Sequence, residues 1–232
     1  MQRYFTNLKE NNNFILNSDD LYHLKVVMRA TKNDMVEVVY NNKLYIAMID
    51  NNNVVLKNEV EDNILKQKEL ILCIPLLAEQ KMSFVLQKAT ELGIDKIIPF
   101  ITTRSIVKLD EKKELKKLER WYKICKEASQ QSKRLTIPII SSIKTIEDLN
   151  IDGLKILCST IEKANTLKKV LNKVNIYDTI VIVVGPEGGL TKDEEQRLIK
   201  QGFIATSLGK NIMRVETVPI YLLSVINYEM ME

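Results

Sequence analysis

The chain has 232 residues, 45% of them hydrophobic, and this composition supports a packed core and excludes a disordered protein. Its single histidine, His23, excludes metal sites built from several histidines, and its three cysteines fit neither a disulfide framework nor a zinc cluster. The net charge is +4, and residues 67–150 carry 16 Lys/Arg against 11 Asp/Glu. This basic middle segment permits a polyanionic partner such as nucleic acid, and a solvated helix face is the alternative explanation.

The apolar segments indicate where in the cell the protein is expected. The longest runs, such as Ile180–Val184, are too short to span a bilayer, and the first residues lack the apolar core of a signal peptide. We therefore expect a cytoplasmic protein with no membrane association. The residue types give no reason to expect a bound metal.

Residues 1–66 are predicted to form a small β domain. Its expected strands are bounded by Asn-rich turns and lie at about residues 3–5, 13–17, 35–40, 43–50 and 53–60. One helix interrupts them. Ser18 is its predicted N-cap, and Asp19 and Asp20 lie in its first turn, where negative charge suits the helix dipole.

Residues 67–232 are predicted to form an α/β domain with a largely parallel sheet, because strands there alternate with helices. The expected strands lie at about 70–75, 96–100, 136–140, 155–159, 179–184 and 204–209, and the helices at about 81–93, 111–131, 164–171, 192–201 and from 219. A polar seam at 62–69 is the predicted domain boundary. On the long helix, the expected buried stripe is Leu115, Leu118, Tyr122 and Cys125.

The stretch VVGPEGGLTKDEEQ joins a strand to a helix through a glycine-rich loop, but it matches neither the dinucleotide fingerprint nor the P-loop. Glu187 lies inside the loop, and Asp193, Glu194 and Glu195 occupy the first turn of the next helix, where they would repel a phosphate. The loop therefore suits a neutral or cationic ligand. The alternative is a tight turn, capped by Thr191, that binds nothing.

A second stretch, SLGKNIMRVETVPIYLL, places a glycine after a strand and then Arg214 and Glu216 two residues apart. In an extended chain these two side chains face the same side. They indicate either a charged pair at a site or an ordinary surface ion pair of small energetic value.

Three further stretches belong with these two: FVLQKATELGIDKIIPFITTRSIVK, RWYKICKEASQQSKRLTIP and HLKVVMRATKND. These five blocks, in the same order and nearly from end to end, resemble the bacterial 16S ribosomal RNA uridine N3-methyltransferases of the SPOUT superfamily. The resemblance implies a trefoil-knotted α/β methyltransferase domain at 67–232, preceded by a PUA-like β-barrel domain at 1–66 that binds RNA. It also implies a homodimer.

The resemblance further implies S-adenosylmethionine as cofactor and N3 of a specific uridine in 16S ribosomal RNA of the small subunit as methyl acceptor. The implied cofactor-binding residues are Gly185, Pro186, Glu187, Gly188, Gly189, Leu208, Gly209, Ile212, Met213 and Arg214. S-adenosylmethionine carries a sulfonium cation and no phosphate, which agrees with the chemistry of the loop.

Arg214 and Glu216 are the predicted catalytic residues. A cation beside N3 lowers the cost of the uracil anion, and a carboxylate orients that cation or accepts the proton. RNA contacts are expected at Arg29, Arg104, Lys108 and Arg134. The alternatives are a SPOUT methyltransferase for another RNA nucleotide, a non-catalytic RNA-binding member of the fold, and a nucleotide-using metabolic enzyme.

Overall fold

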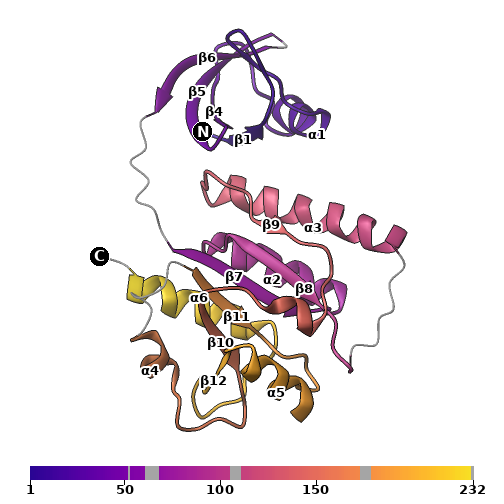
Figure 1. The fold of residues 1–232 in the computed structure, drawn as a ribbon. Coiled ribbons are helices and arrows are strands. Elements are labelled where there is room, and N and C mark those ends of the chain that lie inside the picture. Colours follow the sequence, from indigo (N-terminus) through magenta and orange to yellow (C-terminus); the bar gives the residue numbers. More distant parts are fainter. Residues whose placement is uncertain (52, 61–67, 105–110, 173–178, 231–232) are drawn as a thin grey trace. The chain divides into compact units, whose positions relative to one another are not determined.

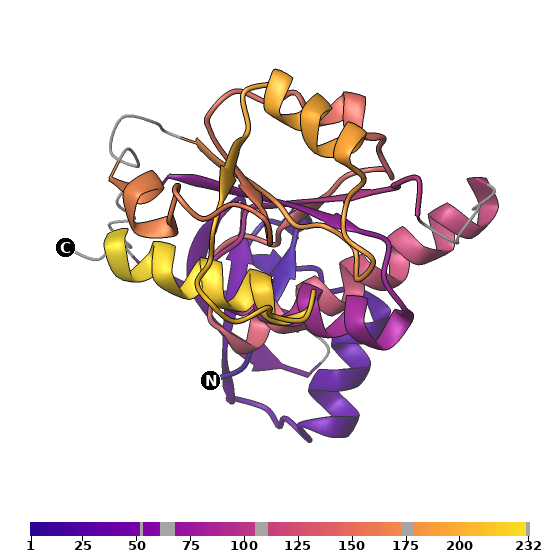
Figure 2. The same cartoon turned by 90° about the horizontal axis from the view of Figure 1, so that it is seen from below.

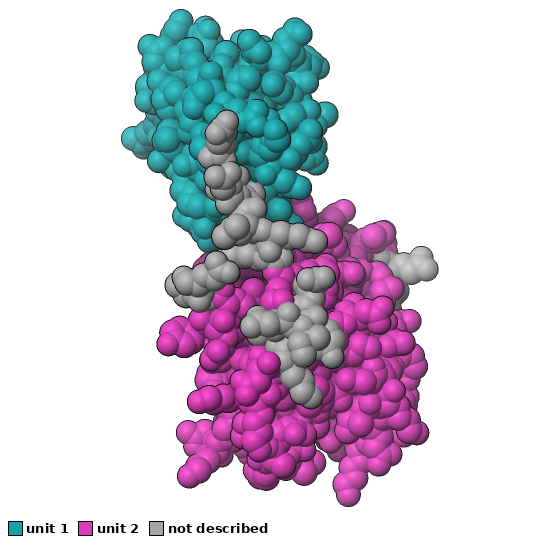
Figure 3. All heavy atoms as spheres, turned by 60° about the vertical axis from the view of Figure 1, so that its left-hand side comes forward, with its two compact units in different colours: residues 1–65, 126–137 teal, residues 66–125, 138–232 magenta. Residues whose placement is uncertain are grey.

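The computed structural model of the chain describes residues 1–51, 53–60, 68–104, 111–172 and 179–230 (Figure 1). The chain divides into two compact units, and Figure 3 colours them separately. The first unit comprises residues 1–65 and 126–137, and the second comprises 66–125 and 138–232. The helix α3 (Glu111–Gln131) therefore contributes residues to both units. The predicted boundary at 62–69 lies outside the described residues, apart from its last two positions.

The first unit is built on a six-stranded sheet in the order β1-β4-β5-β6-β3-β2. Its strands are β1 (Arg3–Thr6), β2 (Lys9–Glu10), β3 (Asn13–Phe14), β4 (Met35–Tyr40), β5 (Lys43–Asp50) and β6 (Asn53–Val60). Neighbouring strands run antiparallel except for the parallel pair β1 and β4. Asn41 and Asn42 make the β4–β5 turn with φ of 50° and 58°, a conformation that asparagine tolerates. The strands predicted from alternation at 35–60 are confirmed.

One helical segment interrupts this sheet, as predicted, but its cap is different. The helix α1 (Ser18–Tyr22) has Asn17 as N-cap, whose side chain accepts a hydrogen bond from the Asp20 N–H at 2.9 Å, so the assignment of Ser18 is wrong. Both residue types cap helices well, and the backbone geometry decides between them. The segment continues as the π-helical turn η1 (His23–Val27).

The second unit is built on a sheet in the order β12-β10-β11-β7-β8-β9, in which every pairing is parallel. Its strands are β7 (Glu69–Pro75), β8 (Lys96–Phe100), β9 (Ile139–Ile140), β10 (Leu154–Cys158), β11 (Thr179–Val183) and β12 (Ile204–Thr206). The central strands are continuous apolar runs because helices cover both faces of a parallel sheet. The predicted α/β arrangement is confirmed.

Helices lie on both faces of this sheet (Figure 2). On one face, α2 (Glu79–Glu91) and α6 (Thr217–Met230) lie side by side, and Asn227 Nδ2 donates to the Leu92 carbonyl at 2.7 Å. The other face carries α5 (Lys192–Lys200) and the 3-10 helix η2 (Ile146–Leu149). The short helix α4 (Leu167–Leu171) follows β10.

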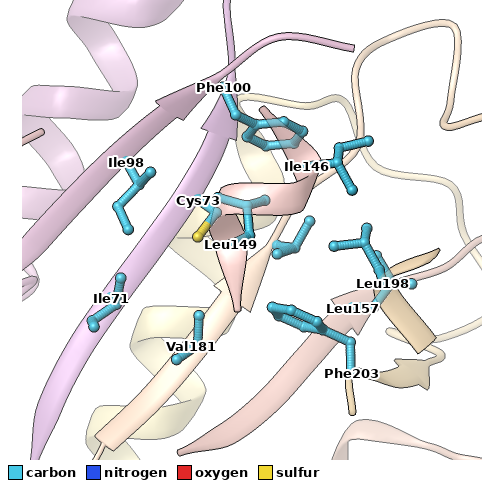
Figure 4. Packing of buried hydrophobic residues seen from close by; sticks show 11 residues of the cluster. Ile71, Cys73, Ile98, Phe100, Ile146, Leu149, Leu157, Val181, Leu198 and Phe203 are labelled. Carbon is cyan, nitrogen blue, oxygen red and sulfur yellow. The ribbon is translucent and has the colours of Figure 1, made fainter. Parts of the chain in front are cut away.

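The core on the α5 side joins helices to strands. Figure 4 shows Ile146 and Leu149 of η2 with Leu198 of α5, packed against Phe100 and Val181 of the sheet. All five side chains are at most 4% exposed. Burial of this kind stabilises the fold by about 25 cal/mol for each Å² of apolar surface removed from water. It holds the helices against the strands and so positions the loops that follow the strands.

The long helix α3 has the predicted bounds but a different buried face. Leu115 and Tyr122 are 62% and 48% exposed, whereas Trp121 and Cys125 are 1% and 0% exposed, so the predicted stripe is wrong at two positions. Trp121 carries more apolar surface than Tyr122, and burying it sets the rotation of the helix. The stripe therefore runs through Trp121 and Cys125 to Ala128.

Candidate functional site

A cavity of about 720 Å³ lies in the second unit at the carboxyl ends of three neighbouring strands. Its walls come from Cys158–Thr160 after β10, from Val184–Leu190 after β11 and from Leu208–Val215 after β12. Lys81 of α2, Lys163, Glu195 of α5 and Val218 of α6 line it as well. Open parallel sheets bind ligands at this end of the strands, and the volume is in the range of small-molecule sites.

The ten residues that the sequence assigned to the cofactor all line this one cavity. They are Gly185, Pro186, Glu187, Gly188, Gly189, Leu208, Gly209, Ile212, Met213 and Arg214. The two loops that contain them are separate in sequence and meet because β10 lies between β11 and β12 and pairs with both. Of the two predicted catalytic residues, Arg214 lines the cavity and Glu216 does not.

The glycine loop has a fixed shape. The Gly189 N–H donates to the Pro186 carbonyl at 2.8 Å, and Gly189 has φ of 70°, which favours glycine. Arg104 Nη1 donates to the carbonyl of Gly188, and it lies 3.4 Å from the carbonyl of Gly189. The Arg104 guanidinium therefore holds the loop by its carbonyl groups.

Glu194 connects the segment after this loop to the segment that follows β8. Thr191 is the N-cap of α5, as predicted, and forms a capping box with Glu194. The Glu194 carboxylate is 2% exposed and accepts the N–H groups of Thr191 and Thr103, each at 2.7 Å. Burial alone would raise the pKa of Glu194, but these hydrogen bonds hold it below its usual 4.5.

We expect Glu194→Ala to destabilise the protein by about 2 kcal/mol, because two N–H groups lose their acceptor and α5 loses the Glu194 half of its capping box. Asp193→Ala is the control, since exposed Asp193 only pairs with Arg197 on the surface and should cost less than about 1 kcal/mol. Urea denaturation measures both.

The same carboxylate predicts a pH dependence of stability. Because the pKa of Glu194 is lower in the folded state than in the unfolded state, the ionised carboxylate stabilises the folded protein above pH 4.5, and this contribution disappears as the pH falls through the folded-state pKa. When the pH falls from 5 to below the folded-state pKa of Glu194, the Glu194→Ala variant should therefore lose less free energy of unfolding than the parent protein. Equal losses would contradict the stabilising role of the Glu194 carboxylate.

Lys81 is a cavity residue that the sequence reasoning missed. Its Nζ donates to Glu187 Oε1 and lies 3.8 Å from Glu216 Oε2. The hydrogen bond to Glu187 and the charges of both carboxylates raise the pKa of Lys81, against the effects of desolvation and of Arg214. One feature of the sequence could have identified Lys81: it is a lysine in the first turn of a helix, where a positive charge opposes the helix dipole.

The segment from Arg214 to Glu216 is not extended. The N–H groups of Thr217 and Val218 donate to the Arg214 carbonyl at 2.9 and 3.2 Å, so the chain turns here as α6 begins. The expectation that an extended chain aims Arg214 and Glu216 to one side is therefore wrong. Arg214 faces the cavity, while the Glu216 side chain is 17% exposed and lies beside Lys81.

The four predicted RNA contacts have different surroundings. Arg29 is exposed and has φ of 51°, in the first unit. Arg134, in the same unit, is half-buried, and its Nε donates to the Thr136 carbonyl at 3.2 Å. Arg104 holds the glycine loop, and Lys108 lies outside the described residues.

The described parts of the chain contain no group of three or more His, Cys, Asp or Glu side chains arranged to hold a metal ion. None of the helices within the described ranges has the length and apolar character needed to cross a membrane.

Comparisons with known proteins give a consistent result. The RNA methyltransferase domain family matches residues 65–227. Curated proteins named ribosomal RNA small subunit methyltransferase E are 34% identical in Mesomycoplasma hyopneumoniae, over 97% of this chain and 98% of the relative, and 32% identical in Bacillus subtilis, over 99% and 97%. The crystal structure of the Neisseria gonorrhoeae protein of that name, bound to S-adenosyl methionine, superposes with a TM-score of 0.86 at 28% identity and covers 98% of this chain and 97% of that one. From these matches, this chain belongs to the RNA methyltransferase domain family, in the group of the ribosomal RNA small subunit methyltransferases E.

Proposed function

We propose that this protein transfers a methyl group from S-adenosylmethionine to N3 of a uridine in 16S ribosomal RNA of the small subunit. One observation carries the proposal: the ten residues assigned to the cofactor, from two separate loops, line a single cavity of about 720 Å³. The names of the relatives and the S-adenosyl methionine bound by the Neisseria gonorrhoeae protein support the same reaction.

The residues of the cavity fit S-adenosylmethionine chemically. The carboxylates of Glu187 and Glu195 line the wall and suit a ligand that carries a sulfonium and an ammonium. Lys163 and Lys210 line it too and suit the ligand's carboxylate. The glycine loop lines the cavity from Gly185 to Gly189, and it has no phosphate-binding pattern.

When bound, S-adenosylmethionine supplies a methyl group that its sulfonium makes electrophilic. The chain must hold the uracil at attack distance and handle the proton on N3, and positioning alone contributes about 7 to 11 kcal/mol in well-oriented reactions. Arg214 lines the cavity, and its guanidinium stabilises the negative charge on deprotonated uracil. Glu216 lies beside Lys81, a residue of the cavity wall, and it accepts the proton or holds the neighbouring cations in place.

We also propose that the second unit contains the trefoil knot. Thr206, the last residue of β12, and Ser207, which follows it, bond to both ends of the loop that follows β10. The Ser159 N–H donates to Thr206 O at 3.0 Å, the Ser207 N–H donates to Asn165 O at 2.8 Å, and the Leu167 N–H donates to Ser207 O at 3.0 Å. A chain threaded through that loop makes such contacts. An electron-density map that traces residues 158–216 without threading would contradict the knot.

The first unit and α6 are assigned further roles in this proposal. The PUA-like unit binds RNA, and Arg29 and Arg134 are its proposed contacts. Apolar side chains on the second unit, including Tyr228 at 76% exposed and Ile212 at 81%, support a symmetric homodimer. Sedimentation at micromolar concentration checks the dimer, and cell fractionation checks a cytoplasmic location.

The test of the function is transfer of a labelled methyl group from S-adenosylmethionine to small ribosomal subunits that lack the modification, followed by mass spectrometry of the digested RNA. We expect 3-methyluridine at a single site. Label on another nucleotide would keep the cofactor assignment and overturn the substrate. Measured cofactor binding without any transfer to subunits or to free 16S RNA would favour the non-catalytic alternative.

A further inference from the structure

One lysine joins three separate elements beside the cavity. Lys81 comes from the first turn of α2, Glu187 from the glycine loop after β11, and Glu216 from the turn before α6. The Lys81 Nζ donates to Glu187 and lies 3.8 Å from Glu216 Oε2. Arg214, which lines the same cavity, adds a like charge near Lys81. We call these four residues the Lys81 cluster.

The position of Lys81 is not explained by the stability of its own helix. A positive charge in the first turn opposes the helix dipole, and Lys81 makes its ion pairs with other elements rather than along α2. Lys88, further along α2, is the ordinary case: it pairs with Glu91 one turn away at 2.8 Å. The contacts of Lys81 are therefore long-range ones.

Glu216 is the second observation. Its Oε2 is buried and has no hydrogen-bond partner among the described residues. A buried carboxylate oxygen normally has a donor, because leaving it without one is costly. A lysine ammonium has three donors, and Glu187 uses one of them. A shift of about 1 Å brings Nζ within hydrogen-bond distance of Glu216.

We propose that Lys81 is a positioning residue for methyl transfer: its ammonium links Glu187 in the cavity wall to Glu216, so that the glycine loop and this carboxylate keep one fixed arrangement beside Arg214. The inference rests on the proposed function and adds a residue to it. Lys81 acts through the two carboxylates and not on the reacting atoms. A fixed arrangement matters because a misplacement of about 1 Å at a reacting group costs on the order of 100-fold in rate.

The test compares Lys81→Met, which keeps the aliphatic stem, with Lys81→Arg, which keeps the charge. Lys88→Met is the matched control, because Lys88 lies on the same helix with a similar exposure, 35% against 36%, and does not line the cavity. We expect the single-turnover rate at saturating cofactor to fall about 30-fold in Lys81→Met. Lys81→Arg should restore most of the rate, and Lys88→Met should keep it.

Affinity for S-adenosylhomocysteine, measured by calorimetry, provides a readout that needs no methyl transfer. We expect Lys81→Met to change it by no more than about threefold, because an exposed ion pair contributes little. In the single-turnover rate, Lys81→Met and Glu187→Gln should be non-additive, since each removes the same link. A loss of affinity as large as the loss of rate would make Lys81 a cofactor ligand and overturn the positioning role, and so would additive effects.

The outcomes separate this inference from the proposed function. If the parent protein transfers no methyl group to unmodified subunits or free 16S RNA, the proposed function fails and the positioning role falls with it. If the parent protein is active and Lys81→Met keeps the same rate, only the positioning role fails. Melting temperatures of the variants show whether a lost rate reflects lost folding, and Lys81→Arg retains the charge if Lys81→Met does not fold.

Discussion

Replacement of Lys126 by methionine should destabilise the first unit by about 4 kcal/mol. The Lys126 Nζ lies 2.5 Å from Asp20 Oδ2, and the two side chains are only 13% and 9% exposed. Gln130 Nε2 donates to the other oxygen of Asp20 at 3.2 Å. Methionine would leave the Asp20 carboxylate buried with this one neutral partner, and an uncompensated buried charge costs far more than a lost surface pair.

Urea denaturation and amide hydrogen exchange in β4 and β5 would measure the effect on this unit. Lys116→Met is the control, because Lys116 is an exposed lysine on the same helix and should change stability by less than about 0.5 kcal/mol. Removing both charges, with Asp20→Leu added to Lys126→Met, should recover much of the loss. A double variant as unstable as the two single changes combined would contradict a buried ion pair.

Replacement of Arg214 by alanine should lower the single-turnover rate of methyl transfer about 300-fold, the scale of losing one donor that stabilises a developing anion. Arg214 lines the cavity with the other nine assigned residues, and its side chain is the cation that the sequence places beside the cofactor. Affinity for S-adenosylhomocysteine should fall less, by about tenfold, because most of the cavity wall remains. Lys200→Ala, an exposed change on α5 away from the cavity, should leave the rate unchanged.

A pH series tests the proposed roles of Arg214 and Glu216. If Arg214 stabilises the uracil anion, raising the pH toward the ordinary pKa of uracil should recover part of the rate of Arg214→Ala. If Glu216 accepts the proton, Glu216→Gln should show the same partial recovery at high pH. An Arg214→Ala rate equal to that of the parent protein at saturating cofactor would contradict the assignment.

The sequence by itself determined the local structure of this protein. Apolar runs gave the strands of the parallel sheet, because a buried strand must be apolar on both faces. The residue type of Thr191 gave the start of α5, because an N-cap acts only on the first turn of its helix. The chemistry of the glycine loop was also local, since Glu187 lies within it.

Only the tertiary structure decided which local features meet. The buried face of α3 depended on where Trp121 could pack, and residues 126–137 belong to the same compact unit as the first strands. Lys81 and Glu187 pair across 106 residues, because β7 pairs with β11 and the elements that follow both strands converge at one end of the sheet. Periodicity and capping act over one or two helical turns, whereas such pairings are set by the order of strands in the sheet. The glycine loop was therefore found from the sequence, and the lysine beside it was not.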